Sequence, residues 1–305
     1  MPELPEVEVV RRGLAPFVTG ATVTGVNVIE PRSLRRHAGP PEDFVARLTG
    51  ARLLAPQRRG KFLWVPFLRA TEEPDGGLEA HEALLLHLGM SGQVLIDTTD
   101  GADRHTRVRI RLDSGNVIDF VDQRIFGSLA LDRLVPGPVP QRAAGETKGP
   151  ALETVPSQVG HIARDPLDPA FDDRVFVRRV RAKRTEVKRA LLDQTLVSGI
   201  GNIYADEALW AARVHPRQPT DQLSAVAAGR VLAEARAVME RALAEGGTSF
   251  DELYVNVNGQ SGYFSRSLRA YGQQGRACER CGRPIVRESF MNRGSHFCAV
   301  CQRIR

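Results

Sequence analysis

The spacing of apolar residues divides the chain into a strand-rich first half and a helical second half. Near the start, Val7, Val10 and Leu14 recur at helical spacing, and Pro5 suits the first turn of a helix. From about residue 21 to 134 the pattern changes to short β-rich runs broken by Gly, Pro or Asp, at 21–30, 51–57, 61–68, 83–90, 93–99, 107–122 and 127–134. Residues 114–115, Ser-Gly, predict a hairpin turn. We therefore expect an α+β protein with an N-terminal two-sheet antiparallel β-sandwich and flanking helices.

Helical periodicity dominates the second half. Thr185 is a candidate cap for a helix that carries Val187 and Leu191, and a second helix is expected over 203–214. A longer helix is expected from about residue 223 to 243, where two glycines end it. Two segments lack apolar periodicity and predict loops: acidic residues 71–82 and Pro/Gly-rich residues 135–160. The expected domains are therefore 1–134, 161–265 and 266–305, with 135–160 as a linker or insertion.

Composition places the chain among ordinary globular proteins. Its 305 residues are 42% hydrophobic and 26% charged, which allows about two domains with real cores. No apolar run approaches the roughly 20 residues that a membrane span needs. The N-terminus has no basic-then-apolar signal pattern. We expect a cytoplasmic protein with no membrane association.

Positive charge is concentrated in two segments. The net charge is +6 and the pI about 9.5. Residues 266–305 hold nine arginines against Glu279 and Glu288, and residues 178–189 hold seven basic residues and one acid. Such segments favour a polyanion partner, most simply nucleic acid, although a basic surface that only promotes solubility remains the alternative. The chain has four lysines against 38 arginines, so Lys61 is a position where a compact ammonium is favoured over a planar guanidinium.

Four cysteines near the end of the chain have the spacing of a zinc site. They are the only cysteines, in the pattern C-x2-C-x16-C-x2-C: Cys278, Cys281, Cys298 and Cys301. Two such pairs supply four thiolates for one tetrahedral zinc, and the segment between them predicts a β-hairpin. The alternative, two disulfides, is disfavoured in the cytosol. Because four cysteines fill the coordination sphere, we expect one structural Zn²⁺.

Six motifs in a fixed order connect these features. They are MPELPEVE at 1–8, QRRGKFL at 57–63, HLGMSG at 87–92, GIGNIYADEAL at 199–209, GYF at 262–264 and the four-cysteine ribbon. Together they resemble the formamidopyrimidine-DNA glycosylase family, bacterial repair enzymes for oxidised purines. The resemblance spans nearly the whole chain, apart from 71–82 and 135–160, which look like insertions. It implies a helix-two-turns-helix domain before the zinc ribbon, in a monomeric, bifunctional DNA glycosylase/AP lyase. Its expected partner is double-stranded DNA with 8-oxoguanine or formamidopyrimidines, preferably opposite cytosine, and no organic cofactor is expected.

The resemblance assigns catalysis to five residues: Pro2, Glu3, Glu6, Lys61 and Arg293. Removal of Met1 frees the Pro2 amine, whose pKa of about 8 leaves a useful neutral fraction to attack the sugar. Because proline is a secondary amine, the adduct is a cationic iminium that drives elimination. Glu3 is the expected general acid/base. Lys61 and Arg293 would hold phosphates beside the lesion and donate protons in β- and δ-elimination.

Each catalytic assignment has a plainer alternative. Pro2 also favours removal of the initiator methionine, and Glu3, Lys61 and Arg293 also suit solvated surface positions. Glu6 would lie in the site, yet a glutamate also stabilises the start of a helix.

Other residues are expected to bind DNA. Family resemblance assigns Met90, Arg124 and Phe126 to the void left by the everted base, although Met90 and Phe126 alone would suggest core packing. Asn202 marks a turn-to-helix junction whose glycines would admit DNA and whose N–H groups would hold phosphate. Asn202 is also a candidate N-cap of the helix, and both roles can hold at once. Further DNA contacts are expected from His105, Lys183 and Tyr263. Residues 255–264 match the loop that covers the everted base, and their Gly and Asn content predicts mobility.

The chain departs from the family pattern at three positions. Ile125 replaces a basic residue, and Gln273 and Gln274 stand where basic residues are frequent, so we expect fewer contacts with the DNA backbone there.

Two other functions fit part of the sequence pattern. One is an enzyme resembling endonuclease VIII, which acts on oxidised pyrimidines, and Leu4 and Met90 argue against it. The other is a zinc protein that binds DNA without catalysis, which leaves Pro2 without a role.

Overall fold

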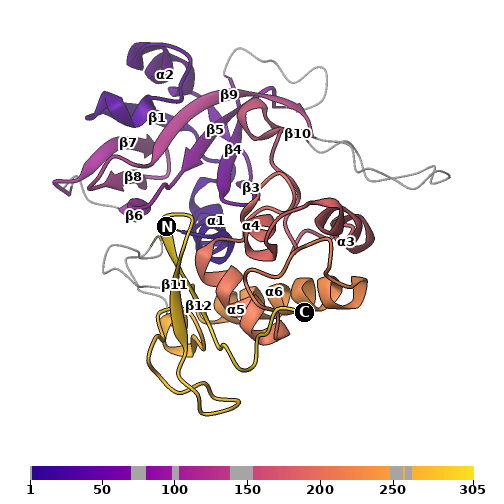
Figure 1. Cartoon of the computed structure of the whole chain (residues 1–305). Coiled ribbons are helices and arrows are strands. Elements are labelled where there is room, and N and C mark those ends of the chain that lie inside the picture. Colours follow the sequence, from indigo (N-terminus) through magenta and orange to yellow (C-terminus); the bar gives the residue numbers. More distant parts are fainter. Residues whose placement is uncertain (1, 70–79, 98–102, 138–153, 248–256, 258–262) are drawn as a thin grey trace.

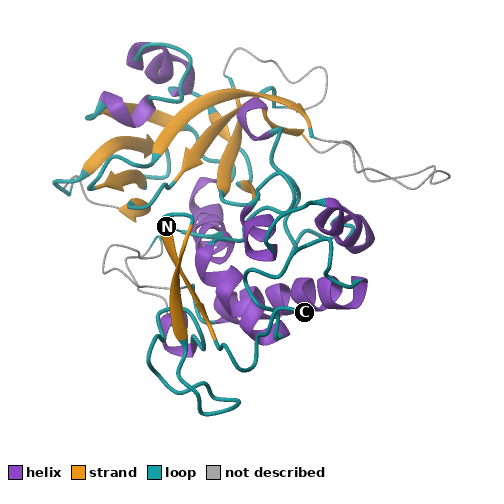
Figure 2. Cartoon of the chain, viewed as in Figure 1, coloured by secondary structure: helices purple, strands orange, loops and turns teal. Residues whose placement is uncertain are grey.

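The computed structural model describes residues 2–69, 80–97, 103–137, 154–247, 257 and 263–305. Figure 1 shows a body of strands above a body of helices, with a two-stranded hairpin beside the helices. Figure 2 separates the same parts by secondary structure. The arrangement confirms the expected α+β class.

The strand body consists of two antiparallel sheets. One has the order β1-β7-β8-β6, and the other has the order β10-β9-β5-β4-β2, with β3 paired to β4. The first sheet contains β1 (Val23–Val28), β6 (Gly92–Asp97), β7 (Thr106–Leu112) and β8 (Val117–Asp122). The second contains β2 (Arg52–Leu53), β3 (Gln57–Arg59), β4 (Phe62–Leu68), β5 (Glu82–His87), β9 (Ser128–Pro136) and β10 (Thr154–Pro156). Gly115, with φ 84°, makes the predicted hairpin turn between β7 and β8.

Alternating residues give the second sheet two buried faces. On β4, Leu63 and Val65 join the core shared with the first sheet. Trp64 points to the opposite face, where it packs with Val155 of β10 and Val159 of the short helix η2 (Ser157–Val159). Both ends of the segment expected to be a linker therefore belong to this sheet, because β9 runs to Pro136 and β10 pairs with it. The centre of that segment, 138–153, lies outside the described residues.

Helix α1 (Leu4–Val18) joins the two bodies, and Figure 1 shows it between the sheets and the helices below. Its first residue, Leu4, lies in the helical core, whereas Val7, Val10 and Leu14 lie in the sandwich core. Helix α2 (Pro41–Leu48) and the short helix η1 (Pro31–Leu34) also belong to the strand body.

The helical body contains three helices where the sequence predicts them: α4 (Val187–Leu192), α5 (Asn202–Ala212) and α6 (Ala225–Ala244). The residue before α4 is Glu186, so the prediction that Thr185 caps this helix is wrong. Helix α3 (Asp173–Ala182) and the short helix η3 (Phe264–Ser267) complete this body. No described helix combines the length and apolar character needed to cross a membrane.

The hairpin of β11 (Val286–Phe290) and β12 (Arg293–Phe297) forms the predicted ribbon. Its two turn residues, Met291 and Asn292, have φ of 46° and 60°. Positive φ at both positions is the mark of a type I′ turn, whose twist matches that of the strands. The base of the ribbon packs on α5 through Trp210, which contacts buried Cys278 and Ile285.

Candidate active site and zinc centre

The start of the chain is anchored at the N-terminus of α5. Pro2 is buried, and Glu3 is 2% exposed. The Glu3 carboxylate accepts hydrogen bonds from the backbone N–H groups of Gly201 (2.6 Å), Ile203 (2.9 Å) and Tyr204 (3.4 Å). The Leu4 N–H donates to the carbonyl of Gly199 at 3.1 Å. A helix N-terminus stabilises an anion, so α5 holds this carboxylate firmly next to Pro2.

Two glycines make this anchoring sterically possible. A Cβ at Gly201 would lie 2.3 Å from the Glu3 carboxyl carbon, and one at Gly199 would lie 2.6 Å from the Leu4 side chain. The prediction that N–H groups here hold phosphate is wrong for Gly201, Ile203 and Tyr204, because these three donate to Glu3. The prediction that Asn202 caps the helix is also wrong, since Gly201 is the N-cap and Asn202 is the first helical residue.

Glu6 holds the peptide group between Pro2 and Glu3 by a hydrogen bond. Its carboxylate accepts the Glu3 N–H at 2.8 Å and the Tyr204 hydroxyl at 2.7 Å. Glu6 is 2% exposed, so it lies in the site and not merely on the helix surface. Tyr204 was not predicted as a site residue, because a tyrosine inside GIGNIYADEAL fits ordinary helix packing equally well.

Lys61 lies opposite Glu3, in the turn between β3 and β4. Its ammonium donates to the carbonyl of Ile200 at 3.1 Å. Burial lowers the pKa of Lys61, an effect that the Glu3 carboxylate opposes and the Arg293 charge reinforces. Burial also raises the pKa of Glu3, opposed by the Lys61 charge. Burial therefore moves the pKa values of both groups toward neutral pH, and the opposite charge of each partner offsets part of that shift.

A buried ion pair seats the ribbon hairpin against α5. The Lys188 ammonium lies 2.6 Å from Asp206, and both side chains are fully buried. Asp206 also accepts the His296 N–H at 2.8 Å. The carbonyl of Gly294, next to exposed Arg293, accepts from the Asn202 amide at 3.0 Å and from Lys188 at 3.3 Å. The structure thus carries Arg293 at the tip of a hairpin fixed to the same helix that holds Glu3.

Lys188 and Asp206 were missed by sequence reasoning. Lys188 lay in a run of seven basic residues and was counted only toward the charge of that run. Lysine is scarce in this chain, and this scarcity, which singled out Lys61, applies equally to Lys188.

Two exposed loops carry Met90, Arg124 and Phe126, which are predicted to fill the space that the everted base leaves in the duplex. Met90 and Phe126 are 48% and 44% exposed, so the alternative of core packing is wrong for both. The carboxylate of Asp122, fully buried, accepts the N–H groups of Arg124 (3.1 Å) and Gly127 (2.6 Å). It also accepts the hydroxyl of Ser91, the neighbour of Met90. One carboxylate therefore holds both loops together.

Three further residues predicted to bind DNA are Lys183, His105 and Tyr263. Lys183, just after α3, pairs with Asp193 at 2.5 Å, and His105 contacts Arg104 at 2.9 Å. Tyr263 is 64% exposed, with the Arg266 guanidinium 5.5 Å from its ring centre. Most of the expected covering loop, residues 255–256 and 258–262, lies outside the described residues. Its one described residue before Tyr263 is Val257, which is buried and accepts the Ile96 N–H at 3.1 Å.

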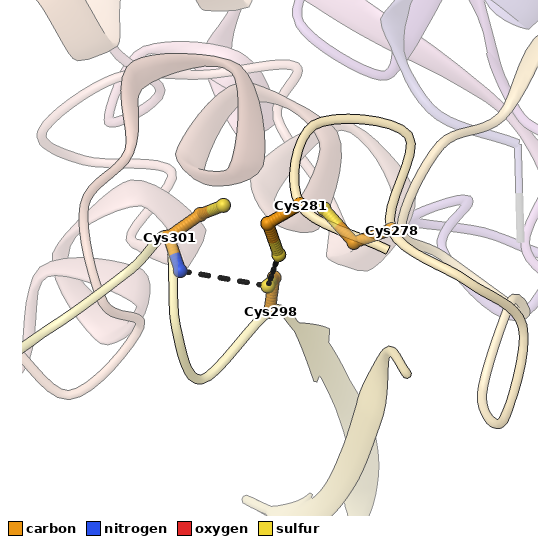
Figure 3. A group of neighbouring side chains, drawn as sticks. All are labelled: Cys278, Cys281, Cys298 and Cys301. Atoms are coloured by element: carbon orange, nitrogen blue, oxygen red, sulfur yellow. Dashed lines mark hydrogen bonds between the residues drawn. The ribbon is translucent and has the colours of Figure 1, made fainter. Parts of the chain in front are cut away.

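The four cysteines converge on one point, as Figure 3 shows. Their sulfur atoms all lie within 4.8 Å of one another, and Sγ of Cys281 and Cys298 are 3.5 Å apart. All four are free thiols, so the two-disulfide alternative is wrong. Zn–S bonds of about 2.3 Å in a tetrahedron place the sulfurs roughly 3.8 Å apart, which matches this cluster. Cys278, Cys281, Cys298 and Cys301 therefore fit one structural zinc with no open coordination position.

Comparison with known proteins decides the family. Three family models match in succession: the formamidopyrimidine-DNA glycosylase N-terminal domain at 1–129, its H2TH domain at 162–252, and a zinc finger found in FPG and IleRS at 275–304. The formamidopyrimidine-DNA glycosylase of Leifsonia xyli is 56% identical, with 100% of each chain covered. That of a Nocardioides species is 55% identical over 99% of this chain and 94% of the relative. The chain belongs to the formamidopyrimidine-DNA glycosylase family.

Solved structures agree with this assignment. A Lactococcus lactis FPG mutant in complex with Fapy-dG-containing DNA has a TM-score of 0.79 at 29% identity, with 99% of each chain covered. The Lactococcus lactis Fpg complex with abasic-site DNA gives 0.78 at 28% identity, with the same coverage. As a formamidopyrimidine-DNA glycosylase, the protein is a zinc-finger enzyme of base-excision repair.

Proposed function

We propose that this glycosylase excises 8-oxoguanine and formamidopyrimidines from double-stranded DNA, preferably opposite cytosine, and then cleaves the strand as an AP lyase. It acts as a monomer in the bacterial cytoplasm, after loss of Met1. One observation carries the proposal: the buried Glu3 carboxylate, next to Pro2, is held by three backbone N–H groups and faces Lys61.

The chemistry begins with the Pro2 nitrogen. It attacks C1′ of the deoxyribose, the bond from C1′ to the damaged base breaks, and the base leaves with the electron pair and the proton that the Pro2 nitrogen gives up. Glu3, whose pKa is raised by burial, donates a proton to the sugar ring oxygen, so the ring opens to an iminium on Pro2. Loss of a C2′ proton then expels the 3′-phosphate, and a second elimination expels the 5′-phosphate.

Lys61 and Arg293 act on the phosphates during these steps. The charge of Lys61 interacts with those of Glu3 and Arg293, and Arg293 stands at the exposed tip of the hairpin seated on α5. Lys61 donates a proton in β-elimination and Arg293 in δ-elimination. The zinc at the four cysteines supplies only the fold of the ribbon that carries Arg293.

Met90, Arg124 and Phe126 enter the duplex where the damaged nucleotide leaves it. Their exposure on two loops tied by Asp122 supports this role. Arg124 bonds the orphaned cytosine, which gives the preference for lesions opposite that base. Ile125 adopts a left-handed φ of 56° beside it and offers no charge to a phosphate.

The substrate class draws support from the relatives. Two structurally similar Lactococcus lactis proteins were solved with Fapy-dG-containing and abasic-site DNA, the substrate and the intermediate of the proposed reaction. Excision of 8-oxoguanine opposite cytosine, compared with thymine glycol, tests the assignment. We expect faster release of 8-oxoguanine, and a clear preference for thymine glycol would favour the endonuclease VIII alternative.

The role of Glu3 is tested by Glu3→Gln. An amide keeps the size of the side chain but cannot deliver the proton, so base release should fall by about 10²- to 10⁴-fold. DNA affinity should change little, because Glu3 is buried and the amide has the size of the carboxylate. Glu42→Gln, at an exposed glutamate of α2, is the matched control and should leave the rate unchanged. An unchanged rate in Glu3→Gln would contradict the role.

A further inference from the structure

The turn that carries Lys61 is wedged against the helical body. Gly60, with φ +56°, lies so close to residues 198–199 that a Cβ would be 2.7 Å from the Ser198 side chain. The next residue, Lys61, donates to Ile200 at 3.1 Å. The loop that receives this turn continues into Gly201, which holds Glu3. The position of Lys61 relative to Glu3 thus depends on how the strand body meets the helical body.

A buried ion pair holds both polar groups of Gly60. Arg58, on β3, donates to Asp165 of the helical body at 2.8 Å and to the Gly60 carbonyl at 3.0 Å. Asp165 accepts the Gly60 N–H at 3.3 Å. The Arg58 and Asp165 side chains are 10% and 3% exposed. Burial makes such a pair costly to separate, so the peptide on both sides of Gly60 is fixed.

Arg58 also reaches α1, the helix that follows Glu3. Its Nε donates to Glu8 of α1 at 3.0 Å. One guanidinium therefore contacts α1, the turn before Lys61 and the helical body. A lysine offers a compact ammonium in place of this planar fork and cannot reproduce all three contacts.

We propose that the Arg58–Asp165 pair is a positioning element that holds Lys61 in register with Glu3 across the boundary between the two bodies. This inference rests on the proposed part of Lys61 in strand cleavage. The pair touches neither the reacting sugar nor the phosphate. It fixes the one peptide that sets the direction of Lys61, and a displacement of about 1 Å at a reacting group costs on the order of 10²-fold in rate.

The test uses a double variant, Arg58→Met with Asp165→Leu. Replacing both partners by apolar residues of similar size avoids an unpaired buried charge and keeps the protein folded. The two contacts on Gly60 are nonetheless lost. We expect the melting temperature to stay within a few degrees of the parent protein and the first-order rate of strand cleavage on preformed abasic-site DNA to fall roughly 10- to 100-fold. The KM should stay nearly unchanged.

Arg12→Gln provides the matched control. Arg12 also contacts Glu8, at 2.8 Å, but contacts neither Gly60 nor Asp165 in the described structure. It should cleave at the parental rate. A double variant that melts with the parent and cleaves at the parental rate would overturn the proposal. If the double variant does not fold, Arg58→Lys takes its place under the same criteria.

The pH dependence of strand cleavage distinguishes a positioning role of the Arg58–Asp165 pair from a purely structural one. Lys61 faces Glu3, Glu6, Arg293 and His87, and burial lowers its pKa. If the turn is released, water reaches the ammonium and its pKa rises, so the alkaline limb of the cleavage profile should move to higher pH. A limb that stays in place while the rate falls would overturn the positioning role.

Lys61→Ala distinguishes failure of this inference from failure of the proposed function. Should Lys61→Ala cleave abasic-site DNA normally, the proposed function of Lys61 is wrong. Should it cleave poorly while the double variant cleaves normally, Lys61 acts as proposed and the ion pair does not position it.

Discussion

At the scale of single residues, Glu3 has two tasks. It serves as the anion at the N-terminus of α5, and in the proposed mechanism it is also the acid next to the Pro2 amine. Each task supports the other, because hydrogen bonds from fixed N–H groups hold the carboxylate where a proton is needed. The catalytic residues are thus positioned by backbone far along the chain.

Gly201→Ala should disturb the contact between Glu3 and the N-terminus of α5, although it adds only one methyl group. The new methyl group would lie 2.3 Å from the Glu3 carboxyl carbon, so Glu3 must move or α5 must shift. We expect base release to fall at least about tenfold, with loss of stability, as measured by excision rate and thermal unfolding.

Gly229→Ala supplies the contrast. Gly229 lies inside α6 with open space around its Cα, so alanine there should stabilise the protein by about 1 kcal/mol. Its excision rate should equal that of the parent protein. Equal behaviour of the two variants would contradict the steric account of Gly201.

The sequence predicted most site residues but not their contacts. Pro2, Glu3 and Lys61 were identified by motif, and the structure brings Glu3 and Lys61 together beside a buried Pro2. What the motif could not show is that Glu3, not phosphate, takes the N–H groups of α5. That outcome depends on contacts between residues about 200 positions apart, which no local pattern records.

At the scale of elements, the ribbon turn has two consecutive non-glycine residues with left-handed backbone, Met291 and Asn292. Met291 has φ 46° and is 49% exposed. Burial of its side chain therefore offsets little of the free-energy cost of the left-handed backbone. Left-handed φ costs an ordinary residue roughly 1–2 kcal/mol, and asparagine tolerates it better. The turn therefore accepts local strain where it presents Arg293.

Met291→Asn should stabilise the ribbon by about 1 kcal/mol. The expected readout is slower loss of zinc to a chelator, because the folded hairpin holds the cysteines in place. Val286→Asn, on an exposed position of β11 with ordinary strand backbone, should give no such gain. Faster zinc loss in Met291→Asn would contradict this view of the turn.

Element prediction succeeded where periodicity was long and failed where it was short. Apart from β3 and β10, the strands of both sheets were expected from their patterns, as were helices α5 and α6. Helices α2 and α3 were not, because each buries only two hydrophobic residues: Phe44 and Leu48 in α2, Phe176 and Val180 in α3. Strand β10 was hidden in a Pro/Gly-rich segment, since its pairing with β9 is decided by tertiary contacts.

At the scale of the whole molecule, α1 and its acidic residues join the two bodies. Glu8 accepts bonds from Arg11, Arg12 and Arg58, and Arg58 continues to Asp165. Burial alone would raise the pKa of Glu8, but its hydrogen bonds and the nearby arginine charges lower it to about 2. The ionised carboxylate is therefore part of the folded state.

This network should make stability depend on pH in a defined window. Because the folded pKa of Glu8 lies below its ordinary value of 4.5, its contribution is present above pH 4.5 and disappears as pH falls through about 2. Glu8→Gln should be less stable than the parent protein near neutral pH, and the difference should shrink toward pH 2. Urea unfolding at a series of pH values measures it. A difference that stays constant down to pH 2 would contradict the assignment.

In the proposed reaction, the ring nitrogen of Pro2, freed at the start of the mature chain, forms the covalent bond to deoxyribose. The most direct measurement is borohydride reduction of the enzyme on 8-oxoguanine DNA, followed by peptide mapping of the cross-link by mass spectrometry. We expect the modified peptide to begin at Pro2 and to carry the sugar on the Pro2 nitrogen. A sugar attached to a lysine side chain, Lys61 above all, would contradict it.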